Sequence, residues 1–175
     1  MTRKLSLITG ATAGLLYAAL LFTTWRAGIG AMASFLTIYT YMPAVLLIIG
    51  GGAWWLKTNL PEEPNFKTLL QYAVLAYLVF ELIYAAANYS LFGVLDKTLN
   101  NELVEHLLTT TSAKLANGGA GKDQIEAVEE MADAGRLPLT LKQTAIGLGQ
   151  NMLVDFLKSL FIATITKQFR IGKNN

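Results

Sequence analysis

The chain has 175 residues, of which 53% are hydrophobic and 15% charged, and its formal net charge is +2. Soluble domains usually carry about 25% charged residues, so the composition favours a lipid bilayer over water as the solvent. The small net charge and the absence of a basic stripe argue against a nucleic-acid partner. Because cysteine is absent and His106 is the single histidine, we expect no metal site and no cofactor.

Four stretches of the chain are long and apolar enough to cross a bilayer, which takes about 20 mostly apolar residues. The second stretch ends in Trp54 and Trp55 just before Lys57, a combination typical of the lipid headgroup level. The sequence therefore predicts an all-α fold, with one membrane domain over residues 1–175 built as a four-transmembrane-helix bundle. The predicted spans are 5–25, 35–56, 68–91 and 140–166.

Segment 92–137, between the third and fourth spans, is predicted to form an extramembrane helical hairpin. Leu99, Leu103 and Leu107 recur every four residues, which is typical of one helix face. The glycine-rich stretch 117–121 breaks this first helix, and a second, acidic helix follows it. The simpler interpretation is a structural one, in which the hairpin packs on its own protein or on the membrane surface. The alternative is that it forms a docking surface for a partner.

The expected topology follows from the basic residues in the short flanks of the spans. Such residues occur before the first span, in the 57–67 connection and after the fourth span. We therefore expect a multi-pass protein with both termini and the 57–67 loop in the cytoplasm. Segment 92–137, which is acidic, is expected on the outer, periplasmic side.

Three ionisable side chains fall inside the predicted spans: Glu81 in the third, and Asp155 and Lys158 in the fourth. Each costs roughly 2.5–3.5 kcal/mol to insert at the centre of a membrane helix, so each should face the bundle interior and have a partner. We predict that spans three and four pack together through an ion pair or water-linked pair of Glu81 and Lys158, joined by Asp155.

A second polar level is predicted nearer the outside, formed by Asn88, Gln150 and Asn151. Hydrogen bonds between helices are the simplest explanation for polar residues at this depth. Gly10 and Gly14 lie four residues apart and place small residues on one helix face, as at sites of close helix packing. The run of glycines at 50–52 predicts a local bend or a close helix crossing.

These features leave two functional classes open. The favoured hypothesis is a non-catalytic membrane component that acts through partners, with the bilayer around it and either another membrane protein or a second copy of the chain as its partner. The alternative is a small ion or proton channel or transporter subunit that uses Glu81, Asp155 and Lys158, since intramembrane carboxylates often mark such paths. We expect no enzyme activity, because no arrangement of catalytic residues is recognisable.

The third span and the segments after it resemble a known family. The similar features are the run IYAAANY at 83–89 with Phe92 and Asp96, the acidic run QIEAVEEM at 124–131, and the basic C-terminal tail. They resemble the small bacterial membrane proteins grouped as "domain of unknown function 4199", over residues from about Tyr39 onward. The proline that this family usually has soon after the aspartate is absent here, where Lys97 follows Asp96. The resemblance implies four helices and a bacterial inner membrane, and it brings no activity, ligand or catalytic residue.

Overall fold

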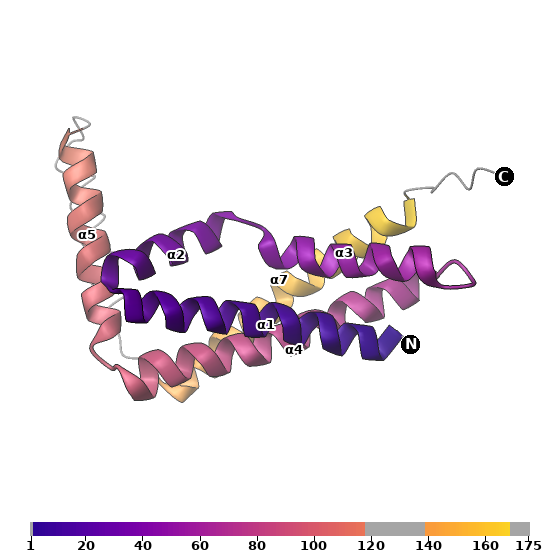
Figure 1. Cartoon of the computed structure of the whole chain (residues 1–175), viewed down its shortest axis with the longest axis horizontal. Coiled ribbons are helices and arrows are strands. Elements are labelled where there is room, and N and C mark those ends of the chain that lie inside the picture. The colour runs from indigo at the N-terminus through magenta and orange to yellow at the C-terminus, as the bar shows by residue number, and fades with distance from the viewer. Residues whose placement is uncertain (1, 118–138, 169–175) are drawn as a thin grey trace. The chain divides into compact units, whose positions relative to one another are not determined.

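The computed structural model describes residues 2–117 and 139–168, and all regular structure in these ranges is helical. The all-α prediction is therefore confirmed for the described part of the chain. The elements (Figure 1) are α1 (Thr2–Ala27), α2 (Ile29–Tyr41), α3 (Ala44–Asn59), α4 (Phe66–Asn88), the π-helix η1 (Tyr89–Leu95), α5 (Leu99–Asn117) and α7 (Leu141–Gln168).

Within the described ranges, three stretches of helix are long and apolar enough to cross a membrane: Thr2–Ala27, Phe66–Leu95 and Leu141–Gln168. They contain most of the predicted spans 5–25, 68–91 and 140–166. The pair α2 and α3 makes a fourth span if the two helices are taken together. Many large apolar side chains of α7 point outward, including Leu153, Leu157 and Phe161, which suits helices surrounded by lipid rather than by water.

The predicted second span, 35–56, is not one helix, because the chain breaks at Pro43. α2 ends at Tyr41 and α3 begins at Ala44. A proline lacks the N–H that an interior helix position needs, and its ring disfavours helical backbone in the residue before it, here Met42. The carbonyl of Pro43 accepts a hydrogen bond from the N–H of Leu47 at 3.0 Å, so Pro43 starts α3 instead of continuing α2. The predicted bend is therefore at Pro43 and not at the glycines 50–52.

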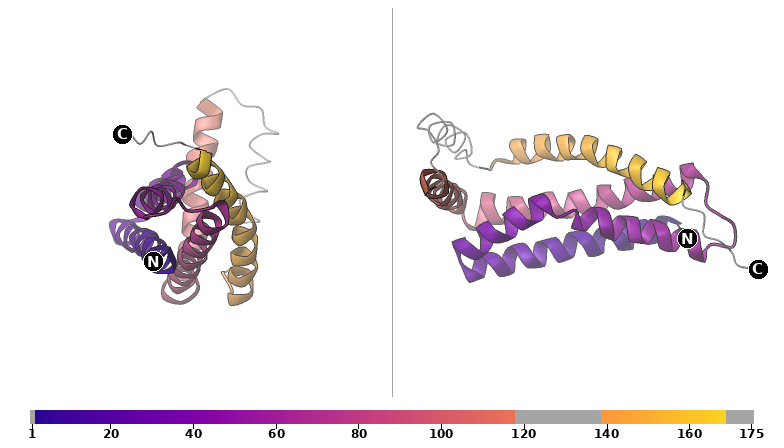
Figure 2. Two further views of the ribbon diagram at one scale, coloured as in Figure 1. Left: turned by 90° about the vertical axis from the view of Figure 1, so that its right-hand side faces the viewer. Right: turned by 90° about the horizontal axis from the view of Figure 1, so that it is seen from above.

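The described chain divides into two compact units. The first comprises the described residues within Met1–Ala18, Met42–Ala85 and Ala145–Asn175. Its segments of α1, α3, α4 and α7 run alongside one another (Figure 2). Their core is formed by buried side chains of α3, α4 and α7, namely Ile49, Ala53, Leu56, Leu69, Tyr72, Ala73, Ala76, Tyr77, Ile162 and Ala163.

The second unit comprises the described residues within Ala19–Tyr41 and Ala86–Thr144. In it α2 packs against α5, and the buried residues include Leu21, Met32, Leu91, Leu99 and Leu103. The predicted leucine stripe of α5 is thus buried at Leu99 and Leu103, whereas Leu107 is exposed. The second helix of the predicted hairpin lies outside the described residues.

Local sequence determines where several of these helices start. Asn65 precedes α4, and its side-chain oxygen accepts the N–H of Thr68 at 2.8 Å. Thr140 and Gln143 form a reciprocal capping box at the start of α7, with bonds of 2.9 and 3.2 Å. Each arrangement satisfies backbone N–H groups that have no partner within the helix.

Candidate functional site: a polar cluster between two spans

The polar cluster is built from one residue of α4, Glu81, and three residues of α7. Asn151, Asp155 and Lys158 follow one another at intervals of four and three residues, so they lie along one face of α7. Glu81 is 5% exposed and Asp155 is 3% exposed. Both acids are therefore buried, and all four residues belong to the first unit.

The hydrogen bonds of the cluster differ from the predicted pairing. Lys158 Nζ donates to Asp155 Oδ1 at 2.8 Å, within the same helix, and not to Glu81. Glu81 Oε2 instead accepts from Asn151 Nδ2 at 3.0 Å. The side chain of Lys158 is 45% exposed, and its amino group lies 5.6 Å from the centre of the Tyr77 ring. The ion pair with Asp155 offsets part of the cost of placing the ammonium group in a membrane helix.

Two polar atoms beside these bonds are buried without a hydrogen-bond partner among the described residues: Asp155 Oδ2 and the hydroxyl oxygen of Tyr77. The carboxyl group of Glu81 is within side-chain hydrogen-bonding reach of that of Asp155. The cluster thus places two acids within hydrogen-bonding reach of each other, with one lysine bound to Asp155.

A cavity of about 30 Å³ adjoins the cluster. That volume has room for a water molecule or two, and most of its wall is apolar. The lining residues are Val74, Tyr77 and Leu78 of α4, and Met152, Asp155, Phe156 and Ser159 of α7.

The structure describes Asn88, Gln150 and Asn151, the residues of the predicted second polar level, in different terms. Asn151 belongs to the cluster through its bond to Glu81. Gln150, its neighbour in the chain, is exposed on α7, and Asn88 falls in the second compact unit. Adjacent residues on a helix point about 100° apart, so Gln150 and Asn151 point in different directions.

Gly10 and Gly14 lie where α1 approaches α4 most closely. A Cβ atom on Gly10 would collide with the carbonyl oxygen of Ala76 and lie 2.9 Å from Val79 Cβ. A Cβ atom on Gly14 would lie 2.8 Å from Ile83 Cβ. Both glycines therefore allow the backbones of two helices to pack closely, as small residues commonly do in membrane helices.

Gly52 makes a similar close approach at the junction of three helices. Its missing side chain leaves room for the hydroxyl of Tyr72 on α4, which hydrogen-bonds Thr9 Oγ1 of α1 at 3.1 Å. The predicted close crossing is therefore at Gly52, while Gly50 and Gly51 face open space.

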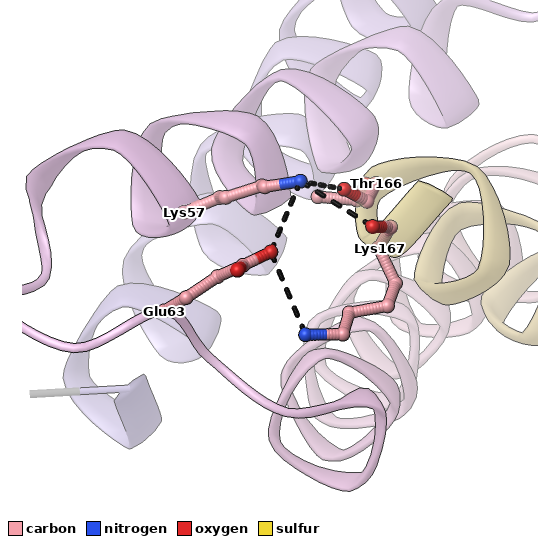
Figure 3. Close-up of polar contacts among 4 residues, drawn as sticks. All are labelled: Lys57, Glu63, Thr166 and Lys167. Carbon is pink, nitrogen blue, oxygen red and sulfur yellow. Dashed lines mark hydrogen bonds and ion pairs between the residues drawn. The ribbon is translucent and has the colours of Figure 1, made fainter. Parts of the chain in front are cut away.

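A buried lysine, which the sequence indicated only as a basic loop flank, caps the end of α7 (Figure 3). Lys57 Nζ donates to the carbonyl of Thr166 at 2.8 Å and to that of Lys167 at 3.4 Å. The last carbonyls of a helix have no partner within it and carry partial negative charge, so a cation from α3 satisfies them. Lys57 and the side chain of Lys167 also pair with Glu63, at 3.4 and 3.5 Å, and the hydrogen bond from Lys57 lowers the pKa of Glu63.

Comparison with models of protein families shows which family the chain belongs to. The model of the family described as "protein of unknown function (DUF4199)" matches residues 4–168. The chain belongs to this family. The suspected resemblance is thus confirmed, over a longer stretch than the region from Tyr39 onward. No curated protein and no solved structure matches the chain significantly.

Asp96, one of the residues that indicated the DUF4199 family, joins two parts of the second unit. Its Oδ2 accepts a hydrogen bond from the indole N–H of Trp25 at 3.1 Å, and its Oδ1 accepts the N–H of Leu99 at 3.1 Å. Asp96 thereby caps α5 and fixes it to the end of α1. The bond from Trp25 holds the pKa of Asp96 below its usual value, and Arg26 lies 4.9 Å from the centre of the Trp25 ring.

Proposed function

We propose that this DUF4199 protein is a non-catalytic membrane component that acts through partner proteins. The observation that carries this proposal is that three polar side chains in its apolar helices bond to a side chain or to the backbone of another helix. Asn151 bonds Glu81, Tyr72 bonds Thr9, and Lys57 bonds the end of α7. Each of these contacts joins two different helices, so these polar groups stabilise the bundle.

The small size of the cavity beside the cluster supports this assignment over transport. A path for ions or protons needs polar groups or water in sequence across the membrane. At the cluster, a mainly apolar cavity of about 30 Å³ adjoins Asp155, and Glu81 and Asp155 are buried. The geometry therefore favours a structural role for the cluster, in which it holds α4 and α7 together, over a role in transport.

We further propose that the membrane is the bacterial inner membrane and that the start of α1, the α3–α4 connection and the end of α7 face the cytoplasm. These three parts lie at one end of the first unit (Figures 1 and 2). Basic residues concentrate there, including Lys4, Lys57 and Lys67, as the positive-inside rule requires of cytoplasmic flanks. Segment 92–137 would then lie on the outer side.

In this proposal the partner is another membrane protein or a second copy of the chain, and it docks on α5. Leu99 and Leu103 of that helix are buried, whereas Glu105, Thr109 and Thr110 are exposed on it. Polar, solvent-facing helices next to a membrane bundle are available to proteins on that side of the membrane.

Affinity purification of the tagged full chain from native membranes tests this proposal. We expect a protein to co-purify with the wild type, and to be lost when Glu105→Arg and Thr109→Arg are combined on α5. The control is Glu62→Arg in the exposed α3–α4 connection, which should retain the partner. Recovery of only the proteins that an unrelated four-span protein also recovers would contradict the proposal.

The alternative, an ion or proton pathway, is favoured by the two buried acids Glu81 and Asp155, which lie within hydrogen-bonding reach of each other. Reconstitution into liposomes with an internal pH-sensitive dye and an imposed potential distinguishes the two. The structural proposal predicts the same dye response as protein-free liposomes. A response that the wild type produces and Asp155→Asn abolishes would establish the pathway instead.

A further inference from the structure

We infer that Glu81 binds a proton inside the membrane at neutral pH and donates it to Asp155 in a hydrogen bond. This site for a single proton is independent of the partner proposed above, because it rests only on how the four side chains of the cluster are paired.

The first step is to assign each carboxylate oxygen its donor. Asp155 Oδ1 accepts from Lys158, and Glu81 Oε2 accepts from Asn151. Asp155 Oδ2 is buried and has no donor among the described residues, although the carboxyl group of Glu81 lies within hydrogen-bonding reach of Asp155. Two ionised carboxylates are both acceptors and cannot bond to each other. A proton on one of them supplies the donor that Asp155 Oδ2 lacks.

The second step is the charge. Among the described residues, the charged groups beside Glu81 are Asp155 and Lys158. Two ionised acids and one lysine would leave a net charge of −1 between two membrane helices. An uncompensated charge in a low-dielectric interior is costly, and two carboxylates that share a site do not both ionise readily. One bound proton makes the cluster neutral.

The third step decides which acid holds the proton. The ammonium group of Lys158 lies 2.8 Å from Asp155 Oδ1, and a close cation favours the ionised form of the acid that it contacts. Among the described residues, the hydrogen-bond donor to Glu81 is the neutral amide of Asn151. The tyrosines near Glu81, Tyr77 and Tyr84 on its own helix, are neutral at this pH, so they do not change the assignment.

Infrared spectroscopy of the full chain in lipid nanodiscs at neutral pH tests the inference, because protonated and ionised carboxyl groups absorb in different regions. We expect the wild type to show one protonated-carboxyl band. Incorporation of glutamate with a ¹³C-labelled side-chain carboxyl should shift this band, whereas labelled aspartate should not. These isotope measurements need no substitution and therefore do not depend on a variant folding.

Glu81→Gln should remove the band, and it should still fold, since its amide can donate to Asp155 Oδ2 while its oxygen accepts from Asn151. The matched control, Glu102→Gln on exposed α5, should leave the band unchanged. The inference would be overturned by a wild type without the band, by a band that shifts only with labelled aspartate, or by one that persists in folded Glu81→Gln.

Discussion

The close approach of α1 to α4 can be measured with one added methyl group. Gly10→Ala places a Cβ atom against the backbone carbonyl of Ala76 and 2.9 Å from Val79 Cβ. Gly51→Ala adds the same methyl group within α3, where nothing lies within 4 Å. Both substitutions gain about 1 kcal/mol of helix propensity, so the difference between them isolates the cost of the collision.

That cost should be about 1–3 kcal/mol, the usual range for overpacking. It should lie toward the upper end, because the carbonyl of Ala76 belongs to the helix backbone and cannot rotate away. For a chain of this size 1 kcal/mol corresponds to about 2–4 °C in the midpoint of thermal unfolding. Gly10→Ala should therefore melt several degrees below Gly51→Ala, in the same detergent and followed by circular dichroism. Equal midpoints would refute the close packing at Gly10.

Three further predictions concern the end of α7, the start of α5 and the membrane topology. Lys57→Met should cost about 1.5–3 kcal/mol in the free energy of unfolding, because the last carbonyls of α7 lose a charged donor. At acid pH the wild type should lose structure around Asp96, and Asp96→Asn should not show this loss. The fluorescence of Trp25 reports it once Trp54 and Trp55 have been replaced. The pKa of folded Asp96 is lowered, so its stabilisation is complete above its unfolded value of about 3.9 and is lost as the pH falls through the lower folded value. In a chain without native cysteine, an impermeant maleimide applied to intact cells should label Asn101→Cys and not Glu62→Cys.

Each of these has its contradicting outcome. Lys67→Met, on an exposed lysine, is the control for Lys57→Met, and equal losses at both would rule out a specific role for the buried amino group. An unchanged acid response in Asp96→Asn would show that protonation of Asp96 does not cause the loss of structure. The opposite labelling pattern would invert the topology.

The sequence predicted the features that helix periodicity controls. Asp155 and Lys158 are three residues apart and were expected to lie on one face, and Gly10 and Gly14 were expected at a close helix contact. Periodicity determines which side chains share a face, and it does so without knowledge of the partner helix.

Features that depend on the partner helix or on side-chain length were not predictable. From the sequence alone, Glu81 and Asn151 are assigned to different levels. A rise of about 1.5 Å per residue places them only a few ångströms apart in depth, which is less than the reach of either side chain. Depth alone therefore does not separate two residues that bond to each other. The bond of Lys57 to α7 joins residues 109 positions apart in the chain, and nothing local indicates it. The break at Pro43, in contrast, had a local signal in the proline itself, which the apolar pattern concealed.

The most direct test of the cluster as a tie between helices is a double-mutant cycle at Glu81 and Asn151. The free energy of unfolding in detergent or bicelles would be measured for the wild type, Glu81→Ala, Asn151→Ala and the double variant. The structure predicts a favourable coupling of about 0.6–1.7 kcal/mol, the range for hydrogen bonds between membrane helices. Additive losses, with no coupling between the two residues, would contradict a bond that holds α4 and α7 together.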